Sequence, residues 1–177
     1  ALCGVTTKPI CVCNACISGL SALILADRLL RAGTYDYAVV CGADLQGKFV
    51  VSGFQSFKAM SGSRCRPFDI ERTGLNLGEA AATVVLSRER PDGNCCSIDA
   101  GSIRNDAWHI SAPVRDGSGL AMAISDVMEG VGFRDIAFIN AHGTATMFND
   151  QMEAQAIGAV SLTDVPVNAL KGVFGHT

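Results

Sequence analysis

The chain has 177 residues, of which 49% are hydrophobic and 18% charged, and its formal net charge at pH 7 is −3. This length suits one domain or two small halves, and the apolar composition indicates a well-filled core or surfaces that something else covers. A net negative chain lacks the basic face that phosphate contacts need, which argues against a nucleic-acid-binding protein.

Residues up to Asn94 predict alternating strands and helices. Strands are expected at residues 10–13, 37–41 and 77–86, helices at 17–32 and 50–60, and a loop at 62–67. The longest apolar run, residues 20–26, is broken by Asp27 and Arg28 and is too short to span a bilayer. Residues 1–4 lack the basic and apolar regions of a secretory signal.

The polar stretch at residues 87–94 contains Pro91 and Gly93 and is the best candidate for a linker. After it the alternation continues. Strands are expected at residues 97–103, 136–140 and 165–169, and helices at 119–130 and 149–160. Strands that alternate with helices of ten or more residues predict a mostly parallel α/β sheet on each side of the linker.

The chain contains eight cysteines. Four of them lie in or beside apolar runs and are expected to be small core residues: Cys41, Cys65, Cys95 and Cys96. Cys11, Cys13 and Cys16 form C-x-C-x-x-C ahead of a predicted helix, which leaves zinc ligands, a redox pair or a single nucleophile open. No fourth ligand follows at a suitable spacing, so no metal site is expected.

The segment N-A-C-I-S-G places Cys16 at a turn from a strand to a helix. The dipole and the free N–H groups of a helix N-terminus favour a thiolate over a thiol, and they can also hold an oxyanion. These features predict a nucleophile, with a buried cysteine of no chemical role as the alternative.

Two histidines follow predicted strands. His142, in N-A-H-G-T-A-T, comes directly after residues 136–140, where α/β sheets place their sites. An imidazole satisfied within the core is the alternative for His142. Lys171 and His176 lie five residues apart in K-G-V-F-G-H-T, after the strand expected at residues 165–169.

These three segments, taken in this order, resemble the active site of beta-ketoacyl-acyl carrier protein synthases of the Cys-His-His type. The residues that match are Cys16, His142, Lys171 and His176. Thiolases share a fold and a cysteine but lack the H-G-T…K…G-H series. Variants with a Cys-His-Asn site would need an asparagine at position 176.

Further segments extend the resemblance over nearly the whole chain, from about Ile10 to Thr177. R-P-F-D at residues 66–69, followed by L-G-E-A at residues 77–80, is similar to the family's central motif. Asn149-Asp150 with Glu153 is similar to the stretch that follows the first histidine. Two departures are Ile17, where a small residue is more usual, and Ala80, where glycine is common.

The resemblance implies a thiolase-like α/β fold with α-β-α-β-α layers formed by two related halves. Residues 1–90 would be the rest of the N-terminal half, which carries the nucleophilic cysteine. Residues 91–177 would begin the C-terminal half, which carries the His/Lys/His residues. Family members are more than twice this length, so the resemblance implies an internal fragment that lacks both ends and is inactive alone.

The chemistry that the resemblance implies is decarboxylative condensation. The thiolate of Cys16 attacks an acyl thioester and holds the acyl chain. His142 and His176, as neutral hydrogen-bond donors, stabilise the enolate that forms when a malonyl thioester loses carbon dioxide.

Four supporting residues are implied as well. Lys171 would adjust the electrostatics around the histidines with Glu153 as its carboxylate partner, although an ordinary ion pair between the two is the alternative. Thr144 and Thr146 would hydrogen-bond the pantetheine arm, with helix capping as the alternative for Thr146.

The implied partners are acyl carrier proteins that present phosphopantetheine-linked acyl and malonyl groups, and a second ketosynthase-like chain in a homodimer or heterodimer. No cofactor, nucleic acid or membrane is implied, and a cytoplasmic location is expected. Carrier proteins are acidic, so docking needs a local basic patch, for which Arg66 and Arg64 are the candidates. Asp69 and Glu71 would neutralise much of this patch.

Three alternatives remain. A non-catalytic ketosynthase-like partner is disfavoured because Cys16 and both histidines are present. A structural fragment without activity is the second alternative. A thioredoxin-like redox protein is the third, but it needs the first cysteine of C-x-x-C to cap the helix, whereas Cys13 falls in an expected strand.

Overall fold

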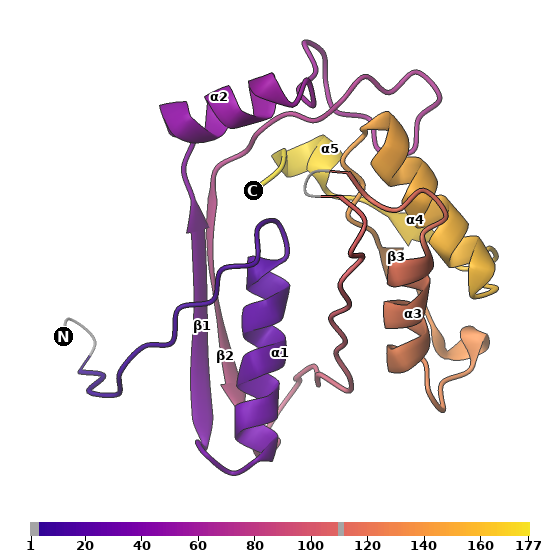
Figure 1. Cartoon of the computed structure of the whole chain (residues 1–177). Helices are drawn as coiled ribbons and strands as arrows, with labels where there is room; N and C mark the ends of the chain where they lie inside the picture. Colours follow the sequence, from indigo (N-terminus) through magenta and orange to yellow (C-terminus); the bar gives the residue numbers. More distant parts are fainter. Residues whose placement is uncertain (1–3, 110–111) are drawn as a thin grey trace. The chain divides into compact units, whose positions relative to one another are not determined.

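The computed structural model describes residues 4–109 and 112–177, and it shows a mixed α/β chain (Figure 1). Residues 1–3, part of the stretch compared with a secretory signal, lie outside the described residues. By its internal contacts the chain divides into two compact units. The first unit comprises the residues up to 42 together with 83–98, and the second comprises residues 43–82 together with 99–177.

The first unit contains α1 (Ser18–Arg31) and most of two paired strands, β1 (Tyr37–Asp44) and β2 (Ala80–Ser87). Helix α1 buries one apolar face that includes Ile24, Ala26 and Leu30. It ends where the N–H of Gly33, at φ +70°, donates to the carbonyl of Leu30, since glycine adopts a left-handed conformation without steric cost. The helix predicted at residues 17–32 and its stop at Gly33 are therefore confirmed.

The two strands of this unit run in opposite directions (Figure 1). The pairing places the N–H of Arg88 on the carbonyl of Asp36 at 3.0 Å, and the hydroxyl of Thr83 3.4 Å from Cys41 Sγ. The expectation of a mostly parallel sheet is wrong here, because the residues between the strands fold into the second unit instead of a single crossover helix.

Two predicted strands are not found among the described residues. Residues 10–13 and 97–103 belong to no helix or strand there. A β-strand is defined by hydrogen bonds to a neighbouring strand, so an apolar sequence alone does not produce one.

The second unit holds the remaining elements: α2 (Lys48–Ser56), α3 (Ser118–Val127), the 3-10 helix η1 (Phe133–Asp135), β3 (Ile139–Asn140), α4 (Met147–Ala159), β4 (Val167–Asn168) and α5 (Lys171–Phe174). Strands β3 and β4 pair in parallel, with Ile139 opposite Val167 and Asn140 opposite Asn168. This pair confirms the parallel arrangement that the sequence predicts after the linker.

Two small apolar clusters form the core of the second unit. Cys65, Leu75 and Ala145 pack with Phe54 and Leu77 in one cluster. The other cluster is built on Ile157, Leu162 and Val165. Among the cysteines expected in the core only Cys65 is buried, because the others lie on the two-stranded sheet or in a loop: Cys41, Cys95 and Cys96.

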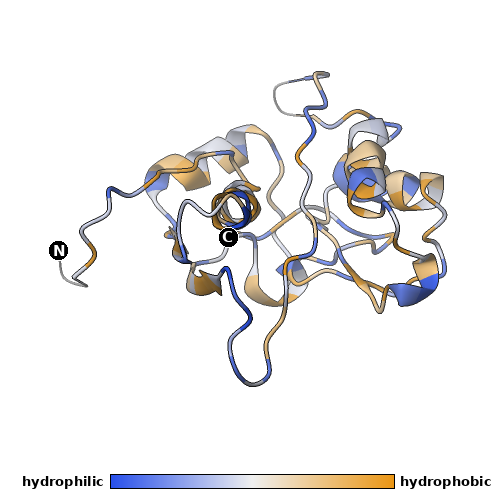
Figure 2. Ribbon diagram, turned by 90° about the horizontal axis from the view of Figure 1, so that it is seen from below, coloured by the Kyte–Doolittle hydropathy of each residue, from blue (hydrophilic) through white to orange (hydrophobic). Residues whose placement is uncertain are grey.

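Many large apolar side chains stay exposed, including Phe49 at 93% and Ile70 at 95%. Hydropathy colouring shows hydrophobic residues along loops as well as helices (Figure 2). Among the described residues no helix combines the length and the apolarity that crossing a bilayer requires.

Candidate active site

Two adjacent parallel strands position the first pair of candidate residues. His142 follows β3 and Lys171 follows β4, so both lie beyond the carboxyl ends of neighbouring strands, where α/β sheets place their sites. The N–H of Ala141 donates to the carbonyl of Asn168 at 2.8 Å and extends the pairing up to His142. The segments that carry His142 and Lys171 therefore meet at this edge of the sheet.

Lys171 contacts His142 twice. Its Nζ donates to the backbone carbonyl of His142 at 2.6 Å and lies 3.2 Å from Nδ1 of the imidazole. An ammonium group has hydrogen atoms to donate and no lone pair, so Nδ1 of the neutral imidazole must be the acceptor. The proton of His142 therefore lies on Nε2, which becomes a hydrogen-bond donor.

His176 lies beside His142, with the two ring centroids 5.4 Å apart and the rings perpendicular. Its side chain is buried, and its Nε2 has no hydrogen-bond partner among the described residues. Phe54 of α2 contacts its ring at a centroid distance of 5.7 Å. The Nδ1 atom lies 3.2 Å from the carbonyl of Thr177, a contact that requires the proton on Nδ1.

The surroundings keep both imidazoles neutral. Burial, the charge of Lys171 and the neighbouring His176 together lower the pKa of His142 to about 4. Burial and the charge of Lys171 also lower the pKa of His176. At neutral pH the pair therefore offers uncharged imidazoles next to a fixed cation.

Glu153 of α4 holds the loop that carries His142. Its carboxylate accepts hydrogen bonds from the backbone N–H groups of His142 and Gly143, both at 2.7 Å, and from Asn149 Nδ2 at 2.8 Å. Burial raises the pKa of Glu153, whereas these donors oppose the rise. These hydrogen bonds fix the backbone of the loop at His142 and Gly143. The role of Glu153 as the carboxylate partner of Lys171 stays a prediction.

The two threonines after His142 bond to each other, with Thr144 Oγ1 and Thr146 Oγ1 2.8 Å apart. Thr146 is the N-cap residue of α4, but its side chain makes no capping hydrogen bond. The capping alternative is therefore not realised, and binding of a substrate arm by these hydroxyls stays a prediction.

Asp150 and Arg72 form an ion pair that links two loops, which the sequence did not reveal. Asp150 is 1% exposed and accepts from the backbone N–H of Phe68 at 2.7 Å and of Ala145 at 3.0 Å. Arg72 Nε lies 3.7 Å from the same carboxylate, and Arg72 NH2 donates to the carbonyl of Met147. These contacts connect the R-P-F-D loop to the H-G-T-A-T loop, and the bonded residues Phe68 and Asp150 are 82 positions apart in the sequence.

The two candidate docking arginines differ in their contacts. Arg66 forms ion pairs with Asp69 at 3.7 Å and with Glu71 at 3.2 Å, as the sequence predicts. Arg64 donates instead from Nε to the carbonyl of Gly172 at 3.0 Å. Both side chains are exposed, and Arg64 directly contacts the segment that carries Lys171 and His176.

Cys16 lies in the first unit, in an exposed turn just before α1. The N–H of Asn14 donates to Ser18 Oγ at 2.7 Å, and this hydroxyl donates to the carbonyl of Ala15 at 2.7 Å. Ala15 has φ 45°, a left-handed conformation that is costly for a residue with a Cβ. The turn that presents the thiol is thus strained and held by side-chain hydrogen bonds.

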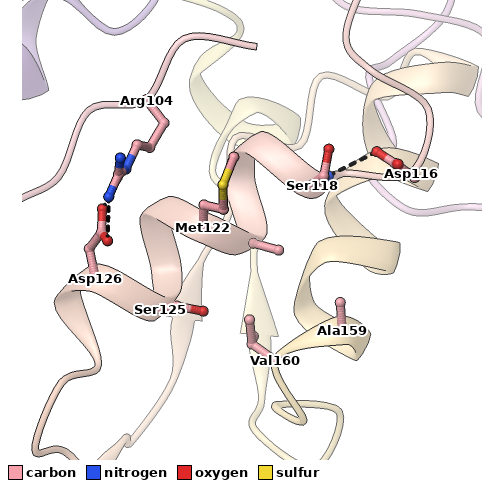
Figure 3. A pocket seen from close by; sticks show the side chains of 9 residues that line it. Arg104, Asp116, Ser118, Met122, Ser125, Asp126, Ala159 and Val160 are labelled. Atoms are coloured by element: carbon pink, nitrogen blue, oxygen red, sulfur yellow. Dashed lines mark hydrogen bonds and ion pairs between the residues drawn. The ribbon is translucent and has the colours of Figure 1, made fainter.

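A separate cavity of about 450 Å³ lies at α3 and the end of α4 (Figure 3). Arg104 and Asp126 lie side by side in its lining and form a two-pronged ion pair, which Ser102 joins through its hydroxyl. Arg104 and Asp126 therefore already satisfy each other, and Asp116 accepts from the backbone N–H of Ser118, so the imidazole pair is the better candidate for chemistry.

Comparison with known proteins gives a consistent result. The protein-family model described as beta-ketoacyl synthase, N-terminal domain, matches residues 2–91. The family model of the beta-ketoacyl synthase C-terminal domain matches residues 95–177. The chain is 30% identical over 191 residues to 3-oxoacyl-[acyl-carrier-protein] synthase 2 of Vibrio cholerae serotype O1, an alignment that covers 98% of this chain and 46% of that protein.

Solved structures give the same picture. The ketosynthase ApeO in complex with its chain length factor ApeC from Xenorhabdus doucetiae matches with a TM-score of 0.85 and 36% identity, over 92% of this chain and 40% of that chain. A type II PKS acyl-carrier protein in complex with its ketosynthase, AntDE:AntF, matches with a TM-score of 0.78 and 27% identity, over 91% and 44%. The chain thus spans less than half the length of these proteins, and the likeness confirms the predicted thiolase-like α/β fold class.

Proposed function

The chain belongs to the beta-ketoacyl synthase family, and from this premise we propose that its protein is an acyltransferase that catalyses decarboxylative condensation. The substrates are an acyl thioester and a malonyl thioester, both carried on acyl carrier protein. The observation that carries the proposal is the pair of neutral imidazoles, His142 and His176, 5.4 Å apart beside the ammonium group of Lys171.

The first step is acyl transfer to Cys16. Its thiolate sulfur attacks the carbonyl carbon of the acyl thioester, and the carbon–sulfur bond to the carrier breaks. The acyl group then stays on Cys16, and the carrier leaves as a thiol after taking up a proton. The strained turn at Ala15 supports this role, because strain of this kind is concentrated at functional sites.

The second step is loss of carbon dioxide from the malonyl group. The bond between the carboxylate and the α-carbon breaks, and its electron pair forms an enolate whose oxygen needs hydrogen-bond donors. His142 supplies one donor, because Lys171 occupies its Nδ1 and leaves the proton on Nε2. The α-carbon then attacks the acyl carbonyl, and Cys16 leaves as a thiolate.

His176 acts as the second donor only in the tautomer with its proton on Nε2. That tautomer gives up the contact between Nδ1 and the carbonyl of Thr177. The unpartnered Nε2 supports a role in binding, because a buried polar atom without a partner is costly unless a ligand satisfies it.

The partners follow from the same premise. We propose that acyl carrier protein docks at Arg64 and Arg66. We also propose that the protein assembles as a homodimer, or as a heterodimer with a second ketosynthase-like chain. A relative named for acyl-carrier-protein chemistry and similar structures solved with a carrier protein or a chain length factor support both partners. The division into an N-terminal half at residues 1–90 and a C-terminal half that begins at residue 91, and the cytoplasmic location, are part of this proposal.

Separate assays of the two half-reactions test the proposal in the full-length protein. We expect His142→Ala and His176→Ala to leave acyl transfer to Cys16 measurable while release of radiolabelled carbon dioxide from malonyl carrier falls about 10²–10³-fold. Cys16→Ala should block loading and still allow decarboxylation. His109→Ala, at the exposed third histidine, is the control and should change neither reaction.

The opposite pattern would overturn the assignment. If His142→Ala loaded no acyl group but released carbon dioxide normally, His142 would be the general base for Cys16. A wild-type protein that performs neither half-reaction would instead identify a non-catalytic member of the family.

A further inference from the structure

Asn76 is a polar residue in an apolar stretch, between Leu75 and Leu77. Leu75 is 2% exposed, and both leucines belong to the cluster around Cys65 and Ala145. A half-buried amide in such surroundings needs hydrogen-bond partners, because an unsatisfied buried polar group is costly.

The side chain of Asn76 bonds to backbone atoms of the preceding loop. Its Oδ1 accepts from the N–H of Cys65 at 2.7 Å. Its Nδ2 donates to the carbonyls of Ser63 at 3.0 Å and of Ser61 at 3.3 Å. The orientation of the amide is unambiguous, since an N–H group can meet only the oxygen and carbonyls can meet only the NH₂ group.

The backbone of the same residue holds His176. The carbonyl of Asn76 accepts from the N–H of His176 at 2.7 Å, and the carbonyl of His176 accepts from the N–H of Gly78 at 2.8 Å. These bonds form an isolated parallel bridge between Leu77 and His176. The approach is so close that a Cβ at Gly78 would collide with the carbonyl oxygen of Phe174.

The two sets of contacts make Asn76 a junction between two segments. Residues 61–65 bond to its side chain, and His176 bonds to its main chain. The same loop touches the segment of His176 independently, through Arg64 Nε and the carbonyl of Gly172, and a Cβ at Gly172 would lie 3.2 Å from the carbonyl oxygen of Cys65.

We propose that Asn76 is a positioning residue for His176. The side-chain amide of Asn76 anchors residues 75–78 to the loop at residues 61–65, and these residues in turn hold the backbone of His176 in place. This inference rests on the proposed function for its effect on catalysis, but the anchoring itself is a property of the fold. The role belongs to the side chain, because any residue at position 76 could offer its main-chain carbonyl to His176.

Asn76→Asp tests the role with almost no change of shape. The carboxylate still accepts from Cys65, but it turns an oxygen without hydrogen towards the carbonyls of Ser61 and Ser63. We expect malonyl decarboxylation to fall at least about tenfold, which corresponds to about 1.4 kcal/mol. Acyl transfer to Cys16 should change less than about threefold, because loading depends on Cys16 and its oxyanion site. The control is Asn94→Asp, at an exposed asparagine.

Hydrogen exchange measured by mass spectrometry gives a readout that does not need activity. In Asn76→Asp the amides of residues 172–177 should exchange at least about tenfold faster than in the wild type, and in Asn94→Asp they should not. Asn76→Ala, which removes the amide without adding a charge, should show the same change and serves if the aspartate variant does not fold.

The outcomes separate the two hypotheses. Unchanged exchange at residues 172–177 in a folded Asn76 variant overturns the positioning role, and so does an equal loss of loading and decarboxylation. A wild-type protein without either half-reaction overturns the proposed function, and hydrogen exchange then still decides whether Asn76 anchors His176.

Discussion

Glutamine at position 153 tests how the loop that carries His142 is held. The carboxylate of Glu153 is buried and accepts three hydrogen bonds, with Oε1 bound to the N–H of His142 and Oε2 bound to the N–H of Gly143 and to Asn149 Nδ2. A glutamine has the same shape but only one acceptor oxygen. Its NH₂ group must therefore face at least one donor that it cannot satisfy.

The size of the effect follows from this count. One stranded buried donor costs about 1–3 kcal/mol, and the surviving bonds lose the extra strength that a charged acceptor gives. We expect Glu153→Gln to lower the free energy of unfolding by about 2–4 kcal/mol. Because the stranded donor lies next to His142, decarboxylation should fall with it.

Urea denaturation of the full-length protein followed by circular dichroism measures the stability change. Amide exchange at His142 and Gly143 reports on the loop itself, and both N–H groups should lose protection. Glu129→Gln is the matched control, because Glu129 is an exposed glutamate and its replacement should stay within about 0.5 kcal/mol. If Glu153→Gln were as stable as Glu129→Gln and kept the protection of both amides, the carboxylate would not be what holds the loop.

Three further predictions concern pH, docking and the nucleophile. The pKa of His142 is about 4, below its unfolded value, so the unfolded state binds more protons between about pH 4 and 6.5. Stability should therefore be full above about pH 6.5 and fall as the pH drops towards 4, and denaturation of His142→Gln should show a weaker slope in that window. Reversing the charge of Arg64 and Arg66 should weaken carrier-protein binding at low salt and less at high salt, and equal affinity at every salt concentration would place docking elsewhere. Cys16 should react with iodoacetamide faster than the other cysteines near neutral pH, and peptide mapping that ranks it among the least labelled would remove it as the nucleophile.

Local patterns predicted the parts of the fold that depend on local order. The helix at α1 followed from its apolar face and Gly33, and strands β3 and β4 lie within the apolar runs in which strands were expected. These inferences succeed because periodicity and strand ends are properties of a short stretch of sequence.

Contacts between distant segments were not predictable in this way. Nothing around Asn76 indicates that its amide bonds to Cys65, and nothing around Asp150 indicates that it accepts from Phe68. The one available signal is a polar residue in an apolar setting, which predicts a partner without naming it. The direction of the strand pair β1 and β2 was missed for the same reason, since it depends on where the chain travels between them.

The contact between Lys171 and His142 also has a consequence for the order of folding. The two residues are 29 positions apart, and parallel strands cannot be joined by a hairpin, so the chain passes through α4 between β3 and β4. Closing the loop between His142 and Lys171 costs conformational entropy, which the contact between the two residues offsets only once it has formed. On a ribosome, which releases the chain from its N-terminus, the imidazole of His142 emerges well before the lysine that orients it. Until Lys171 is in place, nothing in this contact fixes which ring nitrogen of His142 carries the proton.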